Sequence, residues 1–281
     1  MAIPPSLLTF LAGMALMLTS YWLGTHLRLM PVEASANAPI VDNLFQVLFI
    51  IGAILFLGIV GLLGYSLIRF RRQPGDQSDG SAVEDNLPLE ILWTAIPAIV
   101  VLFVGIYSYD IYEQMGGMGA LNDHALMQHG AMQHEVMQVA DADPDPRPRL
   151  WGGITTPSGE ADALPVEVTA LQFAFLFHYP EGDITSGELH VPRDRPVQLR
   201  MEARDVIHAF WVPQFRLKQD VIPGQPTVLS FTATRSGSYP IVCAELCGPY
   251  HGGMRSTVVV HDPDDFDAWL AKNRPAPTAT A

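Results

Sequence analysis

The chain has 281 residues, 49% of them hydrophobic, and a formal net charge of −13. Acidic residues outnumber basic ones by 29 to 16, which argues against nucleic acid and favours cationic or metal-bearing partners. Only two cysteines occur, so no framework of several disulfides supports the fold. The long apolar runs all lie before residue 112, which predicts a membrane-embedded front part and a soluble back part.

The first apolar segment runs from Ser6 to Gly24, close to the roughly 20 residues that cross a bilayer. No basic residue precedes it, unlike a standard signal peptide. Ala34-Ser35-Ala36 downstream nevertheless offers an A-x-A cleavage pattern. Residues 1–36 are therefore either a cleaved signal or a retained anchor, and the sequence slightly favours the anchor.

A hairpin of transmembrane helices is predicted for residues 37–113. Leu44 to Ile68 is uncharged and is followed by three arginines, Arg69, Arg71 and Arg72. These arginines place the polar loop that follows in the cytoplasm. Ile91 to Ile111 returns through the membrane, so the chain after Tyr112 is expected outside the cytoplasm.

One carboxylate, Glu90, stands at the start of the returning helix. An acidic residue in the first turn complements the helix dipole. An ionisable group at a membrane boundary is also a candidate for a proton relay. Both interpretations stay open.

Residues 114–149 are predicted to be a flexible linker rich in methionine and histidine. A His-x-x-Met unit recurs there every five residues, at His124, His129 and His134 and at Met127, Met132 and Met137. This period matches neither a helix nor a strand, so a polar spacer is the plain interpretation. Because thioether and imidazole suit Cu(I), a segment that captures copper is the alternative.

Residues 150–272 show strand-like alternation, as in Leu199 and Met201 or Leu229, Phe231 and Ala233. Turn signals separate the runs near Pro180, Pro223 and Ser236. The pattern predicts a membrane-anchored all-β protein whose soluble domain is a β-sandwich or barrel.

A short helix is expected at the end of this domain. Asp262 and Pro263 suit its N-cap and first position, and Phe266, Trp269 and Leu270 supply an apolar stripe. Residues 273–281 are expected to be a mobile tail.

The richest chemistry lies between Cys243 and Met254, in Cys-Ala-Glu-Leu-Cys-Gly-Pro-Tyr-His-Gly-Gly-Met. Two thiols, an imidazole and a thioether are soft or borderline ligands, and the thioether favours copper over zinc. A disulfide would explain the cysteines but not His251 or Met254. The best candidate for a second histidine is His208, in Asp-Val-Ile-His-Ala-Phe-Trp-Val-Pro.

These residues resemble the dinuclear copper (CuA) site of cytochrome c oxidase subunit II, in aa3-type haem–copper oxidases. The resemblance implies that the β-sandwich or barrel is cupredoxin-like. In that family both cysteines bridge two coppers. One copper adds a histidine and the methionine, and the other adds a histidine and the main-chain oxygen of the glutamate. The resemblance implies copper ligands at His208, Cys243, Glu245, Cys247, His251 and Met254. It also implies that the Glu245 side chain helps to hold a magnesium ion shared with subunit I.

Further positions follow the same family. Lys218 to Gly224 is similar to a family signature, and Asp205 and Asp220 stand where the family places acidic residues that dock cytochrome c. The Leu-Glu-x-x-Trp-Thr-x-Ile-Pro context of Glu90 implies the entrance of a proton path into subunit I. Phe173 replaces the tryptophan at which electrons usually enter, as expected of a cyanobacterial-type sequence. This departure leaves the donor open between a c-type cytochrome and a plastocyanin-like small blue copper protein.

The resemblance implies the electron-entry subunit of cytochrome c oxidase, which reduces oxygen and pumps protons together with subunits I and III. The implied location is the bacterial plasma membrane, or the thylakoid membrane for a cyanobacterial type, with several spans and the CuA domain outside the cytoplasm. A quinol oxidase subunit II would lack the copper ligands. A membrane-tethered copper carrier would need only one helix, and a nitrous oxide reductase would need a large catalytic domain.

Overall fold

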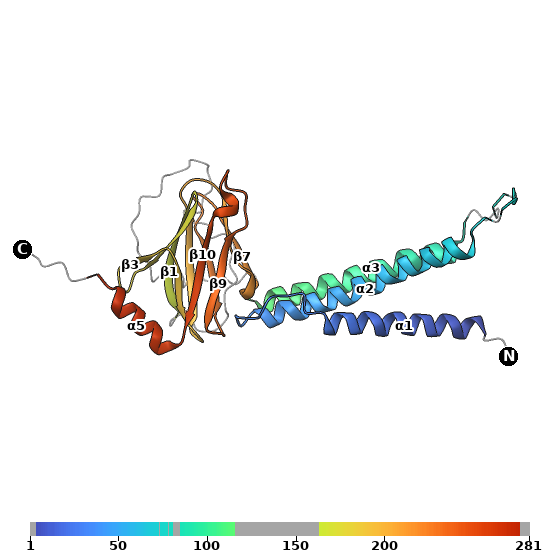
Figure 1. Ribbon diagram of the computed structural model, residues 1–281, viewed down its shortest axis with the longest axis horizontal. Helices are drawn as coiled ribbons and strands as arrows, with labels where there is room; N and C mark the ends of the chain where they lie inside the picture. The colour runs from blue at the N-terminus through green and yellow to red at the C-terminus, as the bar shows by residue number, and fades with distance from the viewer. Residues whose placement is uncertain (1–3, 73, 78, 81–84, 116–162, 276–281) are drawn as a thin grey trace, which may run out of the picture. The chain divides into compact units, whose positions relative to one another are not determined.

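The computed structural model describes residues 4–275 apart from positions 73, 78, 81–84 and 116–162. The chain divides into two units (Figure 1). One is drawn from Met1–Met30 and Val41–Ile111, and the other from Pro31–Ile40 and Tyr112–Ala281. The predictions for the His/Met repeat from His124 to Met137, for a strand pattern starting near Trp151, and for the tail from 276 onwards lie outside the described residues.

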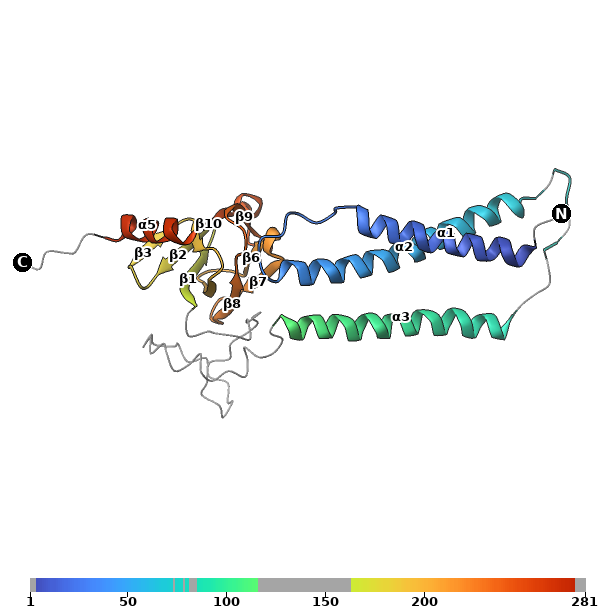
Figure 2. The ribbon, with the colours of Figure 1, turned by 90° about the horizontal axis from the view of Figure 1, so that it is seen from below.

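The first unit is helical (Figure 2). Three helices in the described residues are long and apolar enough to cross a membrane, namely α1 (Pro5–His26), α2 (Ala38–Arg69) and α3 (Leu87–Gln114). Each predicted apolar run is therefore helical. The helices extend beyond those runs, because the apolar stretch marks only the part that lipid would surround, while the helix continues into polar turns such as Asp42.

The second unit contains two five-stranded sheets, in the orders β3-β2-β1-β5-β8 and β4-β10-β9-β6-β7. The strands are β1 (Leu164–Leu171), β2 (Ala174–Tyr179), β3 (Ile184–Ser186), β4 (Leu189–Pro192), β5 (Pro196–Ala203), β6 (His208–Val212), β7 (Leu217–Val221), β8 (Thr227–Thr232), β9 (Gly237–Cys243) and β10 (Arg255–His261). Short 3-10 turns lie at η3 (Pro213–Phe215) and η4 (His251–Gly253), and the closing helix is α5 (Pro263–Asn273). This arrangement confirms the predicted β-sandwich.

Alternating apolar side chains explain why these segments are strands. Along β1, every second residue from Leu164 to Ala170 is buried, so one face turns to the core. Leu199 and Leu229 lie opposite each other across β5 and β8, and both are fully buried, as predicted. Their outward neighbours Gln198 and Ser230, which are also cross-strand partners, are buried as well, so the second face of this pair is not open to water.

Aromatic rings fill the space between the two sheets. Phe175 and Phe177 on β2 meet Phe210 on β6 edge to face, with ring centroids 6.0 and 6.5 Å apart. Burying a phenyl side chain contributes about 1.5–3 kcal/mol. Since Phe210 lies two residues after His208, this packing fixes the strand that begins at the predicted copper ligand.

Helix α5 begins where predicted, with Asp262 at the N-cap position and Pro263 in its first turn. The Asp262 carboxylate does not cap the helix; it accepts a hydrogen bond from Ser236 Oγ at 2.8 Å and pairs with Arg193 Nη1 at 2.9 Å. On the inner face of the helix, Phe266 is buried and Trp269 packs against the core.

Candidate metal centre

Two neighbouring strands bring His208 and Cys243 together. Strands β6 and β9 are antiparallel partners, with Phe210 opposite Cys243. His208 opens β6 and Cys243 closes β9, so both residues lie at the same end of the sheet. Both are buried, with 0% and 3% of their surface exposed.

The loop from Cys243 to Met254 joins β9 to β10 and carries the remaining predicted ligands. Cys243 N–H donates to the Met254 carbonyl at 3.1 Å, which closes the loop at its base. Met254 N–H donates to the His251 carbonyl at 3.1 Å within the short turn η4. These backbone bonds fix the two ends of the loop relative to each other.

Gly248 is required at its position in this loop. Its φ is +131°, which side-chain-bearing residues rarely adopt. A Cβ there would also lie 2.9 Å from Gln172 Nε2 and 3.3 Å from the Phe173 ring. The glycine therefore lets the ligand loop, just past Cys247, approach the segment that carries Phe173.

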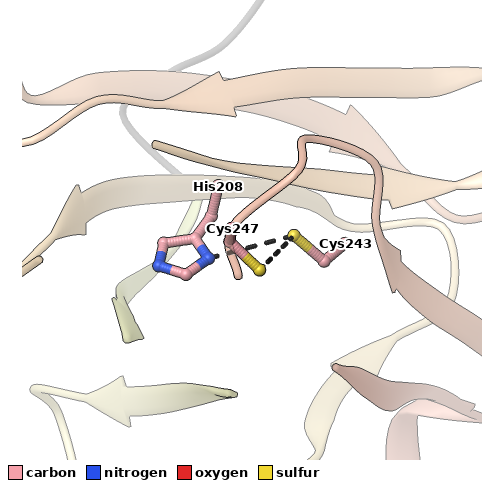
Figure 3. Close-up of side chains that lie close together, drawn as sticks. All are labelled: His208, Cys243 and Cys247. Atoms are coloured by element: carbon pink, nitrogen blue, oxygen red, sulfur yellow. Dashed lines mark hydrogen bonds between the residues drawn. The ribbon is translucent and has the colours of Figure 1, made fainter. Parts of the chain in front are cut away.

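The sulfur atoms converge in the interior (Figure 3). Cys243 Sγ and Cys247 Sγ are 3.8 Å apart, far beyond a disulfide bond of about 2.05 Å, and both cysteines are free. The separation is short enough for one metal ion to bind both sulfurs at the usual distance of about 2.3 Å. The disulfide alternative raised by the sequence is absent from the structure.

The other donor atoms fall into two groups around this sulfur pair. His208 Nδ1 lies 3.9 Å from Cys243 Sγ, and the Glu245 carbonyl oxygen lies 3.3 Å from the same sulfur. His251 Nδ1 and Met254 Sδ lie 3.5 and 3.7 Å from Cys247 Sγ. All six residues of the predicted ligand set therefore gather, with one histidine at each sulfur. Such a set of sulfur and imidazole donors fits copper.

The buried surroundings of the two thiols disfavour the negatively charged thiolate form. Burial, followed by the neighbouring Cys243, raises the pKa of the Cys247 thiol to about 11. A metal cation reverses this preference, because a coordinated thiol is deprotonated. Metal binding here is therefore coupled to proton release from the site.

Asp205 supports the site from behind His208. Its carboxylate accepts hydrogen bonds from His208 Nε2 at 2.8 Å and from the backbone N–H groups of Gln172 and Val206, both at 2.7 Å. Burial alone would raise its pKa, but these hydrogen bonds lower the pKa of Asp205 below its ordinary value. Since Nε2 carries the proton in this bond, the Nδ1 lone pair faces Cys243.

This supporting role was not foreseen for Asp205, which the sequence assigned to donor docking. Its position three residues before a ligand histidine is a usable signal, because ligand histidines commonly donate their other nitrogen to a carboxylate. Gln172, which donates from Nε2 to the Cys247 carbonyl at 2.6 Å, was missed as well. No sequence pattern pointed to Gln172, which lies 75 residues away from Cys247.

Phe173 lies at the edge of the centre. It is half-buried, packs against the core, and meets the exposed Tyr250 ring edge to face at a centroid distance of 5.4 Å. Leu246, between the two cysteines, is 80% exposed. The ligand loop therefore shows an apolar surface to the outside, next to the predicted point of electron entry.

The charged residues predicted around the site are partly exposed. Lys218 Nζ lies 3.5 Å from Asp220 Oδ1 and 3.9 Å from Glu245 Oε2. Asp220 and Glu245 are 46% and 45% exposed, so both carboxylates remain accessible beside one ammonium group.

Glu90 lies apart from this centre, in the first turn of α3. Its Oε1 accepts a hydrogen bond from Asn86 N–H at 3.3 Å, while Asn86 Oδ1 accepts one from Leu89 N–H at 3.2 Å. This reciprocal capping matches the interpretation of Glu90 as a residue that stabilises the start of the helix. The proton-path interpretation stays a prediction.

Comparison with known proteins assigns both units. The family model described as cytochrome c oxidase subunit II, transmembrane domain, matches residues 20–111, and the model described as cytochrome c oxidase subunit II, periplasmic domain, matches residues 181–261. The chain is 47% identical over 290 residues to cytochrome c oxidase subunit 2 of Thermostichus vulcanus, covering 99% of this chain and 88% of the relative. It is 49% identical over 287 residues to cytochrome c oxidase subunit 2 of Synechocystis sp., covering 99% and 86%. Among solved structures, the periplasmic domain of subunit II of cytochrome oxidase (CoxB) of Bradyrhizobium japonicum is 27% identical and covers 40% of this chain and 94% of that one, with a TM-score of 0.38.

Proposed function

The chain belongs to the cytochrome c oxidase subunit II family, and we propose that its soluble domain holds two copper ions as the electron-entry centre of the oxidase. It is a membrane protein with an extracytoplasmic domain and a subunit of a haem–copper oxidase complex. Its own task is one-electron relay from a soluble donor to the haem of subunit I. Oxygen reduction and proton pumping belong to the complex.

The observation that carries the proposal is the donor set around two buried, free thiols 3.8 Å apart. We assign the copper ligands as His208, Cys243, Glu245 through its carbonyl, Cys247, His251 and Met254. Because the donors fall into two groups, one around each sulfur, they would suit two copper ions. When bound, the copper pair would accept and release one electron, and the protein residues would determine how rigidly the pair is held.

Neighbouring residues of this chain hold the donor atoms in place. Asp205 keeps His208 in the tautomer whose Nδ1 lone pair faces the sulfur. Gln172 fixes the Cys247 carbonyl, and the Cys243–Met254 backbone bond closes the loop. A preorganised, buried site changes little in geometry when its charge changes by one, which favours fast electron transfer.

We propose that electrons enter over Phe173. Its ring borders the ligand loop at Gly248 and meets Tyr250, so it offers a flat contact close to Cys247. The exposed Leu246 and Tyr250 suit an apolar contact with the donor, and Asp220 suits a ring of positive charge around it. Such a donor is a c-type cytochrome or a small blue copper protein with a positive patch. Asp205 is expected to contribute less to docking, because its carboxylate is already hydrogen-bonded inside the site.

Two further assignments concern the rest of the complex. The Glu245 carboxylate would give a magnesium ion one oxygen ligand, with the others supplied by subunit I, since magnesium takes few protein carboxylates per site. Glu90 would receive protons at the membrane boundary and pass them toward subunit I. The proposed partners are subunits I and III, the electron donor and membrane lipid, with no role for nucleic acid. The proposed location is the plasma membrane or the thylakoid membrane.

Purification of the affinity-tagged chain from membranes tests the proposal. We expect a haem-bearing subunit to co-purify, and the complex to consume oxygen when reduced donor is added. Cys247→Ser should keep the haem-bearing partner but lose donor oxidation. Ser238→Ala, an exposed position on β9, serves as the matched control and should keep both. Recovery of the chain with copper but without haem would instead identify a membrane-tethered copper carrier.

A further inference from the structure

The A-x-A segment between α1 and α2 is part of the folded β-domain. Ala34 N–H donates to the Gln214 carbonyl and Ala36 N–H to the Thr232 carbonyl, both at 3.0 Å. In return, Thr234 N–H donates to the Ala34 carbonyl at 3.0 Å. Ser35 forms an antiparallel bridge with Ala233, so the segment pairs with the chain just past β8 like a short edge strand.

Side chains anchor the same segment. Ser35 Oγ donates to the Phe215 carbonyl at 2.8 Å, and Arg216 Nη2 donates to the Pro31 carbonyl at 2.6 Å. Ala34 is fully buried and Ser35 is 2% exposed. Cleavage after Ala36 would therefore separate paired and buried residues from the domain that they complete.

The helix before this segment is packed rather than free. Ser20 and Gly24 on α1 are its buried residues, and a side chain at position 24 would collide with Ile50 of α2. Gln46 Nε2 of α2 donates to the Gly24 carbonyl at 3.1 Å. Small residues that allow close backbone approach, together with an interhelical hydrogen bond, are typical of permanent contacts between membrane helices.

We propose that Ala34-Ser35-Ala36 is not a processing site: α1 is retained as a third membrane span, and residues 31–38 form a structural edge of the extracytoplasmic domain. The domain is then assembled from two chain segments, one before α2 and one after α3. Both segments must lie on the same side of the membrane, which the two crossings by α2 and α3 satisfy. This sidedness agrees with a cytoplasmic loop after Arg69, Arg71 and Arg72. The inference does not depend on the copper or donor assignments.

The N-terminus of the mature chain tests the retained helix. The full chain is tagged at its C-terminus, purified from membranes in its complex, and examined by intact mass and N-terminal sequencing. We expect a chain that still carries residues 5–36. A mature N-terminus at Asn37, or anywhere else after Pro5, would overturn the proposal.

Hydrogen exchange tests the edge strand in the same purified protein. We expect the amides of Ala34 and Ala36, which donate to the domain, to exchange as slowly as those of β8. Ser35→Arg places a long cation in the buried position without altering Ala34 or Ala36, and should speed exchange there by at least tenfold. Glu33→Arg introduces the same side chain at an exposed position of the same segment, and as the matched control it should exchange like the parent. Fast exchange in the parent, or equal exchange in both variants, would show that the segment is not built into the domain.

Discussion

Replacing Asp205 with alanine should weaken copper binding although Asp205 is not a ligand. In the folded domain, its carboxylate joins His208 Nε2 to the backbone N–H groups of Gln172 and Val206. Alanine leaves His208 free to rotate or to change tautomer, and it leaves two backbone donors without their acceptor. The Gln172–Phe173 segment also loses its backbone tie to Asp205, while the Gln172 Nε2 bond to the Cys247 carbonyl remains.

The expected size of the effect follows from similar interactions. Losing the carboxylate partner of a ligand histidine costs about 10- to 100-fold in metal affinity. This range corresponds to about 1.4–2.8 kcal/mol, and each hydrogen bond to a charged group contributes a similar amount to stability. The contributions overlap, because the three bonds share one carboxylate. Asp205→Asn keeps the shape and one acceptor oxygen, so its loss should be smaller than that of alanine.

Competition with a copper chelator measures the effect in the detergent-solubilised protein. Asp220→Ala is the matched control, because Asp220 is a partly exposed carboxylate on β7 that pairs with Lys218. We expect the control to retain the affinity of the parent. Equal affinities for the Asp205 and Asp220 variants would refute the role of Asp205 in holding His208.

Three other predictions concern the loop, the donor and the effect of pH. Gly248→Ala should destabilise the domain by about 1–3 kcal/mol in thermal unfolding, because it combines a φ of +131° with a Cβ 2.9 Å from Gln172 Nε2. Gly252→Ala is the control and should leave the stability unchanged, because a Cβ at position 252 would lie in open space. The rate at which a cationic donor reduces the protein should fall as salt rises, since the Debye length falls to about 8 Å at physiological ionic strength. Asp220→Asn should weaken this salt dependence. A rate that does not depend on salt would remove Asp220 from the docking surface. Burial, helped by His261, lowers the pKa of His190 to about 4, and burial also lowers the pKa of His261. Both histidines are thus harder to protonate in the folded than in the unfolded chain. The free energy of unfolding should therefore be highest above about pH 6.5 and should decline as pH falls toward 4. Denaturation of His190→Gln at several pH values should show a flatter decline.

The sequence was sufficient to predict which donor residues lie together, because most of them are close along the chain. Cys243, Cys247, His251 and Met254 share one loop whose length is set by a hairpin between adjacent strands. His208 lies 35 residues before Cys243, and the family resemblance supported its choice as the second histidine. The alternating strands and the apolar helices were also visible, since each depends on neighbouring residues along the chain.

Contacts between distant segments were not predictable in this way. Asp205 reaches Gln172 across 33 residues, and Ser35 reaches Phe215 across 180 residues. A short A-x-A pattern looks the same whether it is cut or paired with a sheet, because only the partner strand distinguishes the two. The apolar runs end inside the helices for a related reason: capping contacts such as those of Asn86 and Glu90 are weaker signals than an apolar run.

Electron paramagnetic resonance of the copper-loaded protein, with the copper content measured on the same sample, tests the central claim most directly. The ligand geometry predicts two coppers per chain and one unpaired electron shared equally between two copper nuclei. Replacing either cysteine should abolish this signal, and Met254→Leu should mainly shift the reduction potential. One copper per chain with the spectrum of a mononuclear blue copper site would contradict the account.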